Sequence, residues 1–249
     1  MAGARGGRFV RYVALDEGAA SEGYPFDLPV VDGLRRAWLT LGPGVTFLVG
    51  ENGSGKSTLV EGVAVAAGFN AEGGSRSFRF ATRSSESALG GALRIGRAPG
   101  REERSFFLRA ESYYNVATEI ERLDREGGGP PILPAYGGVS PHERSHGESF
   151  LDLLTHRFLP DGLYLLDEPE AALSVRGCLL AAARMDALVR RNCQFLVATH
   201  SPVLLAVPGA RILQIGDDGR IDPVGYDDAL PVRAMREVLD DPRGALRGL

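Results

Sequence analysis

Residues 44–67 constrain the fold of this chain more than any other segment. An apolar run at 44–49 predicts a strand that is buried on both faces of a sheet, and the loop VGENGSGKST leads from it into a predicted helix. The loop fits the pattern G-x-x-x-x-G-K-[ST] in full. Its fixed positions are Gly50, Gly55, Lys56 and Ser57. A strand, a glycine-rich loop and a helix in this order indicate an α/β protein with a mostly parallel sheet flanked by helices.

The loop also predicts a nucleotide site. Successive backbone N–H groups at the start of such a helix bind phosphate oxygens, and glycines let the backbone approach them. Lys56 would neutralise the β- and γ-phosphates, and the Ser57 hydroxyl would ligate Mg²⁺. Lys56 is the only lysine among 28 basic residues, which favours a specific role. We therefore expect ATP and Mg²⁺ as ligands, and we assign nucleotide binding to Gly50, Asn52, Gly53, Ser54, Gly55, Lys56, Ser57 and Thr58.

A second chemical element lies at 163–174, with the sequence LYLLDEPEAALS. The apolar residues place Asp167 at the C-terminal end of a buried strand, where ligands bind in open α/β sheets. Asp167 would hold Mg²⁺, and Glu168 would take a proton from the water that attacks the γ-phosphate. The plain alternative is a strand-ending turn, because Pro169 stops a β-ladder. The complete phosphate loop upstream favours the functional interpretation.

The remaining pattern predicts one domain over residues 1–249. Further strands are predicted at 9–15, 194–199 and 211–215, and helices at 147–157, 174–191 and 232–239. Residues from about 70 to 145 are rich in Gly, Ser and Arg and predict an inserted β/α lobe that contains a helix at 112–123.

Bulk composition narrows the function classes. The net charge of −4 gives no general attraction to nucleic acid. Residues 73–109 carry eight arginines, which form either a solvated face or, less often, a phosphate-binding surface. No apolar stretch approaches the roughly 20 residues of a membrane span, and no secretory signal is visible, so we expect a cytoplasmic protein with no membrane insertion. Cys178 and Cys193 have no ligand-like spacing and are expected to be reduced thiols.

Three short segments resemble motifs of ABC-type ATPases. LLDEPEAALS resembles their Walker B motif and D-loop, and ATHSP at 198–202 resembles the switch-histidine motif, with the histidine at His200. SHGES at 145–149 resembles the signature motif in the variant form of stand-alone ABC ATPases. With the phosphate loop, the set resembles a bacterial family of small ABC-type ATPases that are described as AAA-family or ATP-binding proteins.

This resemblance implies an ATP-dependent homodimer. In ABC ATPases two heads face each other head to tail, so that each nucleotide lies between the phosphate loop of one chain and the signature of the other. Ser145 and Gly147 would then contact the γ-phosphate bound by the partner, while Glu148 would either cap its own helix or reach the ribose. His200 would hydrogen-bond the γ-phosphate in its own chain, or else be a strand-end residue bonded to backbone. The catalytic residues implied are Glu168, His200 and Lys56.

The sequence departs from this family at one place. The glutamine that ligates Mg²⁺ in the family has no counterpart, because the chain contains only Gln194 and Gln214. Glu111 is the metal ligand that we expect instead, with Asn115 as the alternative. The adenine contact stays open between aromatic and arginine side chains that precede the loop. These are Tyr24, Phe26, Trp38, Arg35 and Arg36.

The expected activity is hydrolysis of ATP, coupled to an unknown partner protein. A transporter motor is disfavoured by the missing glutamine and by the SHGES signature. A DNA-repair or SMC-like head would need a coiled coil or a nuclease, for which 249 residues leave no room. A regulatory or defence module, associated with DNA or with a protein, is permitted. A module that only holds ATP would be expected to lack Glu168.

Overall fold

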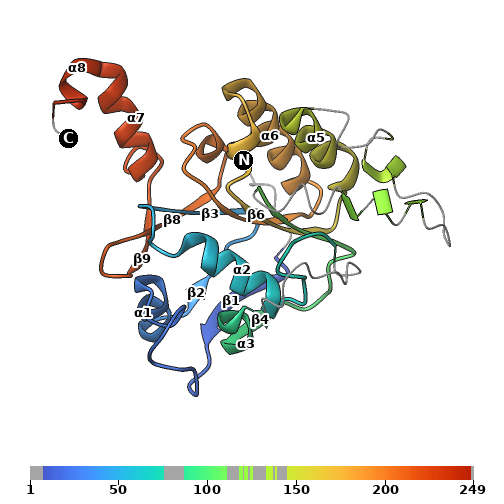
Figure 1. The fold of residues 1–249 in the computed structure, drawn as a ribbon, viewed down its shortest axis with the longest axis horizontal. Helices are drawn as coiled ribbons and strands as arrows, with labels where there is room; N and C mark the ends of the chain where they lie inside the picture. The colour runs from blue at the N-terminus through green and yellow to red at the C-terminus, as the bar shows by residue number, and fades with distance from the viewer. Residues whose placement is uncertain are drawn as a thin grey trace.

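The computed structural model describes residues 8–75, 87–110, 118–119, 121–122, 124–125, 133–136, 138 and 145–247. Its centre is a six-stranded sheet with the strand order β5-β6-β7-β3-β8-β9 (Figure 1). The strands are β3 (Val45–Gly50), β5 (Arg104–Arg109), β6 (Gly162–Asp167), β7 (Gln194–Ala198), β8 (Arg211–Ile215) and β9 (Ile221–Val224). Every neighbouring pair is parallel except β8 and β9. The mostly parallel sheet that the sequence predicts is therefore confirmed.

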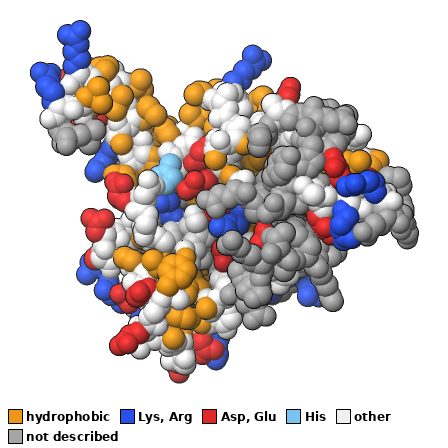
Figure 2. All heavy atoms as spheres, in the orientation of Figure 1, with side chains coloured by type: hydrophobic (Ala, Val, Ile, Leu, Met, Phe, Trp, Pro, Cys, Tyr) orange, Lys and Arg blue, Asp and Glu red, His pale blue; other side chains and the backbone are white. Residues whose placement is uncertain are grey.

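Helices cover both faces of this sheet (Figure 1). One face carries α1 (Pro29–Arg36), α2 (Lys56–Ala66) and α3 (Ala88–Ala92), and the other carries α5 (His146–Asp152) and α6 (Val175–Val189). Short helical turns complete the chain as η1 (Leu133–Tyr136), η3 (Leu153–Arg157), η4 (Pro169–Ala172) and η5 (Leu204–Ala206). The C-terminal helix α7 (Leu230–Asp240) begins at the core, where Val232 is buried, and extends outward to α8 (Pro242–Ala245). Figure 2 shows hydrophobic side chains along these two helices.

The sheet separates two hydrophobic clusters, because successive side chains of a strand point to opposite faces. On β5, Phe106 and Leu108 belong to the cluster under α5 and α6, whereas Phe107 belongs to the cluster around α2. All six residues of β3 and all six of β6 are buried. Strands covered on both sides explain the continuous apolar runs that mark them in the sequence.

A smaller antiparallel sheet packs on the α2 side, with the order β2-β1-β4. Its strands are β1 (Val10–Leu15), β2 (Leu39–Thr40) and β4 (Leu93–Arg97). The buried side chain of Gln194 joins this sheet to β7: its Oε1 accepts from the N–H groups of Phe9 and Val10, each at 2.8 Å. Gln214 Oε1 in turn accepts from Leu230 N–H at 2.8 Å. Both glutamine side chains thus form hydrogen bonds within the fold.

The predicted helix over 147–157 is divided in the structure. α5 ends at Asp152, and the next turn, η3, widens to a π-helix in which Phe158 N–H donates to Leu153 O. This turn buries Leu153, Leu154 and Phe158 against the sheet. The packing of these apolar side chains, which the local sequence pattern cannot specify, accounts for the change of helical pitch.

The segment 70–145 takes part in both sheets where the structure describes it. β4 pairs with β1, and β5 pairs with β6 at the edge of the central sheet. Its division from the rest as an inserted lobe stays a prediction. Within the described part of the chain, no helix is long and apolar enough to cross a membrane.

Candidate nucleotide site

The glycine-rich loop has the backbone geometry that its glycines permit. Gly53 and Gly55 adopt φ angles of 81° and 92°, in the left-handed region that residues with a Cβ rarely enter. A Cβ on Gly55 would also lie 2.5 Å from Val30 Cγ1, whereas a Cβ on Gly53 would meet nothing within 4 Å. Gly55 is thus required by conformation and by space, and it is the N-cap residue of α2.

Lys56 is a buried cation. It is only 4% exposed, and its Nζ donates to Gly50 O at 2.9 Å and to Glu51 O at 2.8 Å. Among the described residues its ammonium forms no ion pair within 4 Å. Burial lowers the pKa of Lys56, although the charges of Glu168, Asp167, Glu51 and Glu170 act against this shift. The surroundings therefore disfavour the charged form of Lys56, whereas an anion bound at this loop would stabilise it.

The sheet brings the predicted chemical groups to one edge. β7 lies between β6 and β3, and its Ala198 is paired with both Asp167 and Leu48. Because these strands are parallel, their C-terminal ends share this edge, and the residues that follow them lie together. The phosphate loop, Asp167 and His200 therefore lie at the same edge of the sheet.

Glu168 has a strained backbone. Its φ and ψ are 49° and 51°, a left-handed conformation that costs roughly 1–3 kcal/mol for a residue other than glycine. Its N–H extends the ladder by donating to Ala198 O at 3.0 Å. The side chain is 45% exposed, and its Oε1 lies 3.9 Å from His200 Nε2. Strain of this kind gathers at functional sites, so the outlier supports a role for this carboxylate.

His200 is held through its backbone. Its N–H donates to Glu170 Oε1 at 2.5 Å. Its Nε2 atom is buried and has no hydrogen-bond partner among the described residues. A buried ring nitrogen in that condition is suited to an external hydrogen-bond partner.

Arg109 connects the end of β5 to the site. It pairs with Glu61 of α2 at 2.7 Å, its Nε lies 3.8 Å from Asp167 Oδ2, and its Cα is opposite that of Asp167 in the sheet. Glu111 follows two residues later but lies outside the described residues, as does Asn115. The structure thus brings the strand end next to Asp167, while the metal ligand itself stays a prediction.

No protein-only metal cage is present in the part of the chain that the structure describes, where no three His, Cys, Asp or Glu side chains cluster suitably. Mg²⁺ is usually held by one or two carboxylates together with substrate phosphates. Asp167, which is 6% exposed, and Ser57 in the first turn of α2 fit that kind of site.

The signature-like segment begins α5. Ser145 is its N-cap, and Glu148 completes a capping box: Ser145 N–H and Oγ donate to Glu148 Oε2 at 3.0 and 2.7 Å. Of the two roles considered for Glu148, the structure contains the cap. A Cβ on Gly147 would lie 2.9 Å from Ala172 O, so α5 packs closely on η4. Ser145 and Ala172 border the same surface hollow.

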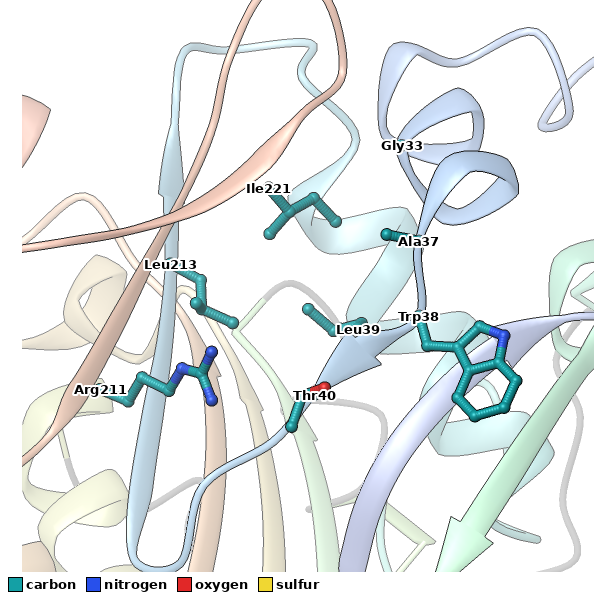
Figure 3. A pocket seen from close by; sticks show the side chains of 8 residues that line it. All are labelled: Gly33, Ala37, Trp38, Leu39, Thr40, Arg211, Leu213 and Ile221. Carbon is teal, nitrogen blue, oxygen red and sulfur yellow. The ribbon is translucent and has the colours of Figure 1, made fainter.

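The aromatic candidates for adenine binding differ in position. The Tyr24 side chain is 75% exposed, with its hydroxyl 3.4 Å from Thr58 Oγ1 of the phosphate loop. Trp38 stacks on Tyr12 instead, with ring centroids 4.7 Å apart. Figure 3 shows the hollow beside Trp38, with the indole turned away from Leu213 and Ile221. At about 90 Å³ it is smaller than the roughly 300 Å³ of the smallest usual ligand sites.

Sequence reasoning gave Glu170 and Arg109 no role in the site. The available signal for Glu170 was its position three residues after Asp167, on the turn that leaves the strand. Arg109 had a weaker signal, as a charged residue directly after the apolar residues 106–108. Their partners come from other elements, so the contacts themselves were not visible in the sequence.

The chain is similar to one protein family and to several solved structures. A family model described as "AAA domain" matches residues 34–127, which include the phosphate loop. No curated protein matches the sequence. An SMC head domain from Thermotoga maritima is 16% identical over 87% of this chain and 99% of that chain, with a TM-score of 0.46. An ATP-binding subunit of an ABC transporter is 17% identical over 92% of each chain, with a TM-score of 0.48.

One solved structure shares the fold of this chain. A structure described as a metal-chelate type ABC transporter in an inward-facing conformation covers 92% of this chain, and 89% of that chain is matched. The identity is 12% and the TM-score is 0.51. Together with the strand order and the flanking helices, this likeness shows that the chain has the α/β fold of ABC-type ATPase domains.

Proposed function

We propose that the protein binds MgATP and hydrolyses it, in a head-to-tail dimer that forms when ATP is bound. The observation that carries this proposal is the environment of Lys56. A buried ammonium is bonded to the carbonyl groups of a glycine-rich loop, at the sheet edge where Asp167, Glu168 and His200 also lie. This combination suits a phosphate-binding site better than a structural role, because burial of the charge is unfavourable by itself.

Each residue of the site has a separate chemical role. The loop N–H groups and Lys56 bind the phosphates, and Asp167 with Ser57 would hold Mg²⁺, which neutralises charge on the β- and γ-phosphate oxygens. Glu168 accepts a proton from the attacking water. His200 uses its buried Nε2 to hold the γ-phosphate. Glu111 is proposed as a further metal ligand because it follows the strand that ends beside Asp167.

The position of Ser145 supports the proposed dimer. It lies at the start of α5 and borders a surface hollow whose lining residues come from α5, η4 and the start of α6 and include none of the phosphate loop. A second copy placed head to tail would bring Ser145 and Gly147 to the nucleotide. The coupled process and its protein partner are not identified by any residue of the site.

Tyr24 is the residue that we propose for adenine stacking. Its ring is exposed next to Thr58, where the base of a nucleotide on the loop would extend. An aromatic face binds any base by stacking, so this contact supplies affinity with little selectivity.

A nucleic-acid function finds little support in three of the arginines that the structure describes within residues 73–109. Arg94 pairs with Asp16 at 2.8 Å, Arg97 with Glu102 at 3.0 Å, and Arg109 with Glu61. Arginines neutralised in this way contribute less to phosphate binding. These contacts favour the solvated-face interpretation for Arg94, whose side chain is 72% exposed.

The test is titration calorimetry with MgATP, combined with a phosphate-release assay. We expect the wild-type protein to bind and to hydrolyse ATP, and Lys56→Ala to bind at least about tenfold more weakly, because an interaction with a charged group contributes about 1.5–3 kcal/mol. Arg101→Ala, at an exposed position outside the loop, is the matched control. Equal affinity of wild type and Lys56→Ala for MgATP would contradict the phosphate-site assignment.

A further inference from the structure

Glu170 is a carboxylate that the proposed mechanism leaves without a role. It belongs to η4, the turn that follows Asp167 and Glu168, and its Oε1 accepts the 2.5 Å hydrogen bond from His200 N–H. A hydrogen bond to an ionised acceptor is roughly twice as strong as one between neutral groups. The contact therefore fastens the segment after β7 to the segment after β6.

The second oxygen of Glu170 points to function instead of stability. Oε2 is buried and accepts no hydrogen bond from the residues that the structure describes. Desolvating a carboxylate oxygen without such a partner is costly. Since nearly all buried polar groups in proteins are satisfied, an exception beside a candidate site calls for an explanation.

Glu170 lies close to the phosphate loop without belonging to it. Burial lowers the pKa of Lys56, and among the four carboxylates that oppose this effect Glu170 is the weakest, after Glu168, Asp167 and Glu51. Unlike Glu168, whose Oε1 lies 3.9 Å from the ring nitrogen of His200, Glu170 accepts the backbone N–H of that residue, so its hydrogen bond acts on the main chain of His200.

The ring of His200 depends on its main chain for orientation. Within the described residues its Nε2 forms no hydrogen bond, and the nearest acidic oxygen, Glu168 Oε1, is 3.9 Å away. The backbone bond to Glu170 is consequently the polar contact that restrains this residue. We infer that Glu170 is a positioning residue, which fixes the backbone of His200 so that the imidazole meets the γ-phosphate; this rests on the proposed function of His200.

The kinetic test separates positioning from binding. Glu170→Ala removes the acceptor, and we expect kcat for ATP hydrolysis to fall about 10- to 100-fold, the usual range for loss of a supporting contact. The Kd for MgATP, measured by calorimetry, is expected to change by less than about twofold, because the lost interaction acts in the transition state. Glu170→Gln keeps an acceptor oxygen and is expected to recover most of the activity. Glu237→Ala, on the exposed side of α7, is the control.

A second test does not depend on activity. Selective ¹⁵N-histidine labelling gives four backbone amide peaks, since the chain has four histidines, and the peak lost in His200→Asn identifies His200. In Glu170→Gln this amide proton is expected to move upfield, because a neutral acceptor polarises the N–H bond less, while the other peaks stay in place. Circular dichroism checks the fold, and if Glu170→Ala does not fold, the Glu170→Gln spectrum decides.

The outcomes distinguish the two proposals. Wild-type kcat in Glu170→Ala, or an unmoved His200 amide in Glu170→Gln, would overturn the positioning role. A fall in kcat that is accompanied by an equal loss of MgATP affinity would also overturn it. A wild-type protein without hydrolysis would contradict the proposed function, whereas the amide shift would still test the contact.

Discussion

Glu168 and His200 lie beside each other at the ends of the neighbouring strands β6 and β7, with Glu168 Oε1 3.9 Å from His200 Nε2. Different backbone features position the two side chains. Glu168 adopts a left-handed backbone, and His200 is held by the bond from its N–H to Glu170. This arrangement suits a general base next to a γ-phosphate ligand, and it leads to the first prediction.

Glu168→Gln should abolish most of the hydrolysis without loss of ATP binding. Glutamine keeps the shape of the side chain but cannot accept the proton of the attacking water, so we expect the rate to fall by about two to four orders of magnitude. ATP that is not cleaved should hold two chains together. Size-exclusion chromatography with light scattering, with and without MgATP, is expected to show a stable dimer for this variant. Hydrolysis by Glu168→Gln at the wild-type rate would show that Glu168 is not the general base. An inactive variant that binds ATP as a monomer would argue against the dimer.

Ser145→Arg should separate binding from hydrolysis. Ser145 lies in the segment that would contact the partner's nucleotide, so a bulky cation there should leave ATP binding by the single chain intact and block hydrolysis. A mixture of Ser145→Arg and Lys56→Ala chains should regain part of the activity, because one composite site of the mixed dimer has no substitution. Either variant alone is the control. No recovery over a range of mixing ratios would count against a site shared between chains.

Lys56→Met should make the protein more stable at neutral pH. Burial lowers the pKa of Lys56 below its ordinary value of 10.5, so the unfolded chain binds this proton more tightly than the folded one. The free energy of unfolding therefore carries a full penalty below the folded-state pKa, and the penalty decreases as the pH rises toward 10.5.

Thermal unfolding at pH 7 and near pH 10 measures this effect. We expect a higher Tm for Lys56→Met than for the wild type at pH 7, and a smaller difference near pH 10. Each roughly 1 kcal/mol added to the free energy of unfolding raises the Tm by about 2–4 °C in a chain of this size. Arg101→Met is the control for removal of an exposed cation. A Tm of Lys56→Met below that of the wild type at pH 7 would show that the carbonyl bonds outweigh the desolvation of the ammonium.

Tyr24→Ala should weaken MgATP binding by about 1–3 kcal/mol, the usual contribution of a base stacked on an aromatic ring. Tyr24→Phe keeps the ring and should bind almost as the wild type does. Trp38→Ala is the matched control, because this exposed indole stacks on Tyr12. The Kd values come from calorimetry. Loss of affinity in Trp38→Ala, with no loss in Tyr24→Ala, would place the base near the three-stranded sheet instead.

The candidate site was predictable from the sequence where its geometry is local. The phosphate loop is continuous in the chain, and the φ angles of Gly53 and Gly55 depend on those residues themselves. Asp167 was predictable because a run of apolar residues marks a strand buried on both faces and the first charged residue marks its end. The strands β3, β6, β7 and β8 and the helix α6 followed from the same periodicities, whereas β5 and β9 were not among the predicted strands.

Contacts between distant segments were decided by the tertiary structure. The order of the central sheet places β7 between β6 and β3, and it is this order that brings His200 N–H to Glu170 and Asp167 to the edge that carries the phosphate loop. Tyr24 was one of several aromatic candidates for adenine stacking, and only the fold shows its hydroxyl 3.4 Å from Thr58 Oγ1. Hydrophobic periodicity specifies which face of an element is buried, but not which element lies next to it, because that choice depends on packing complementarity summed over the whole core.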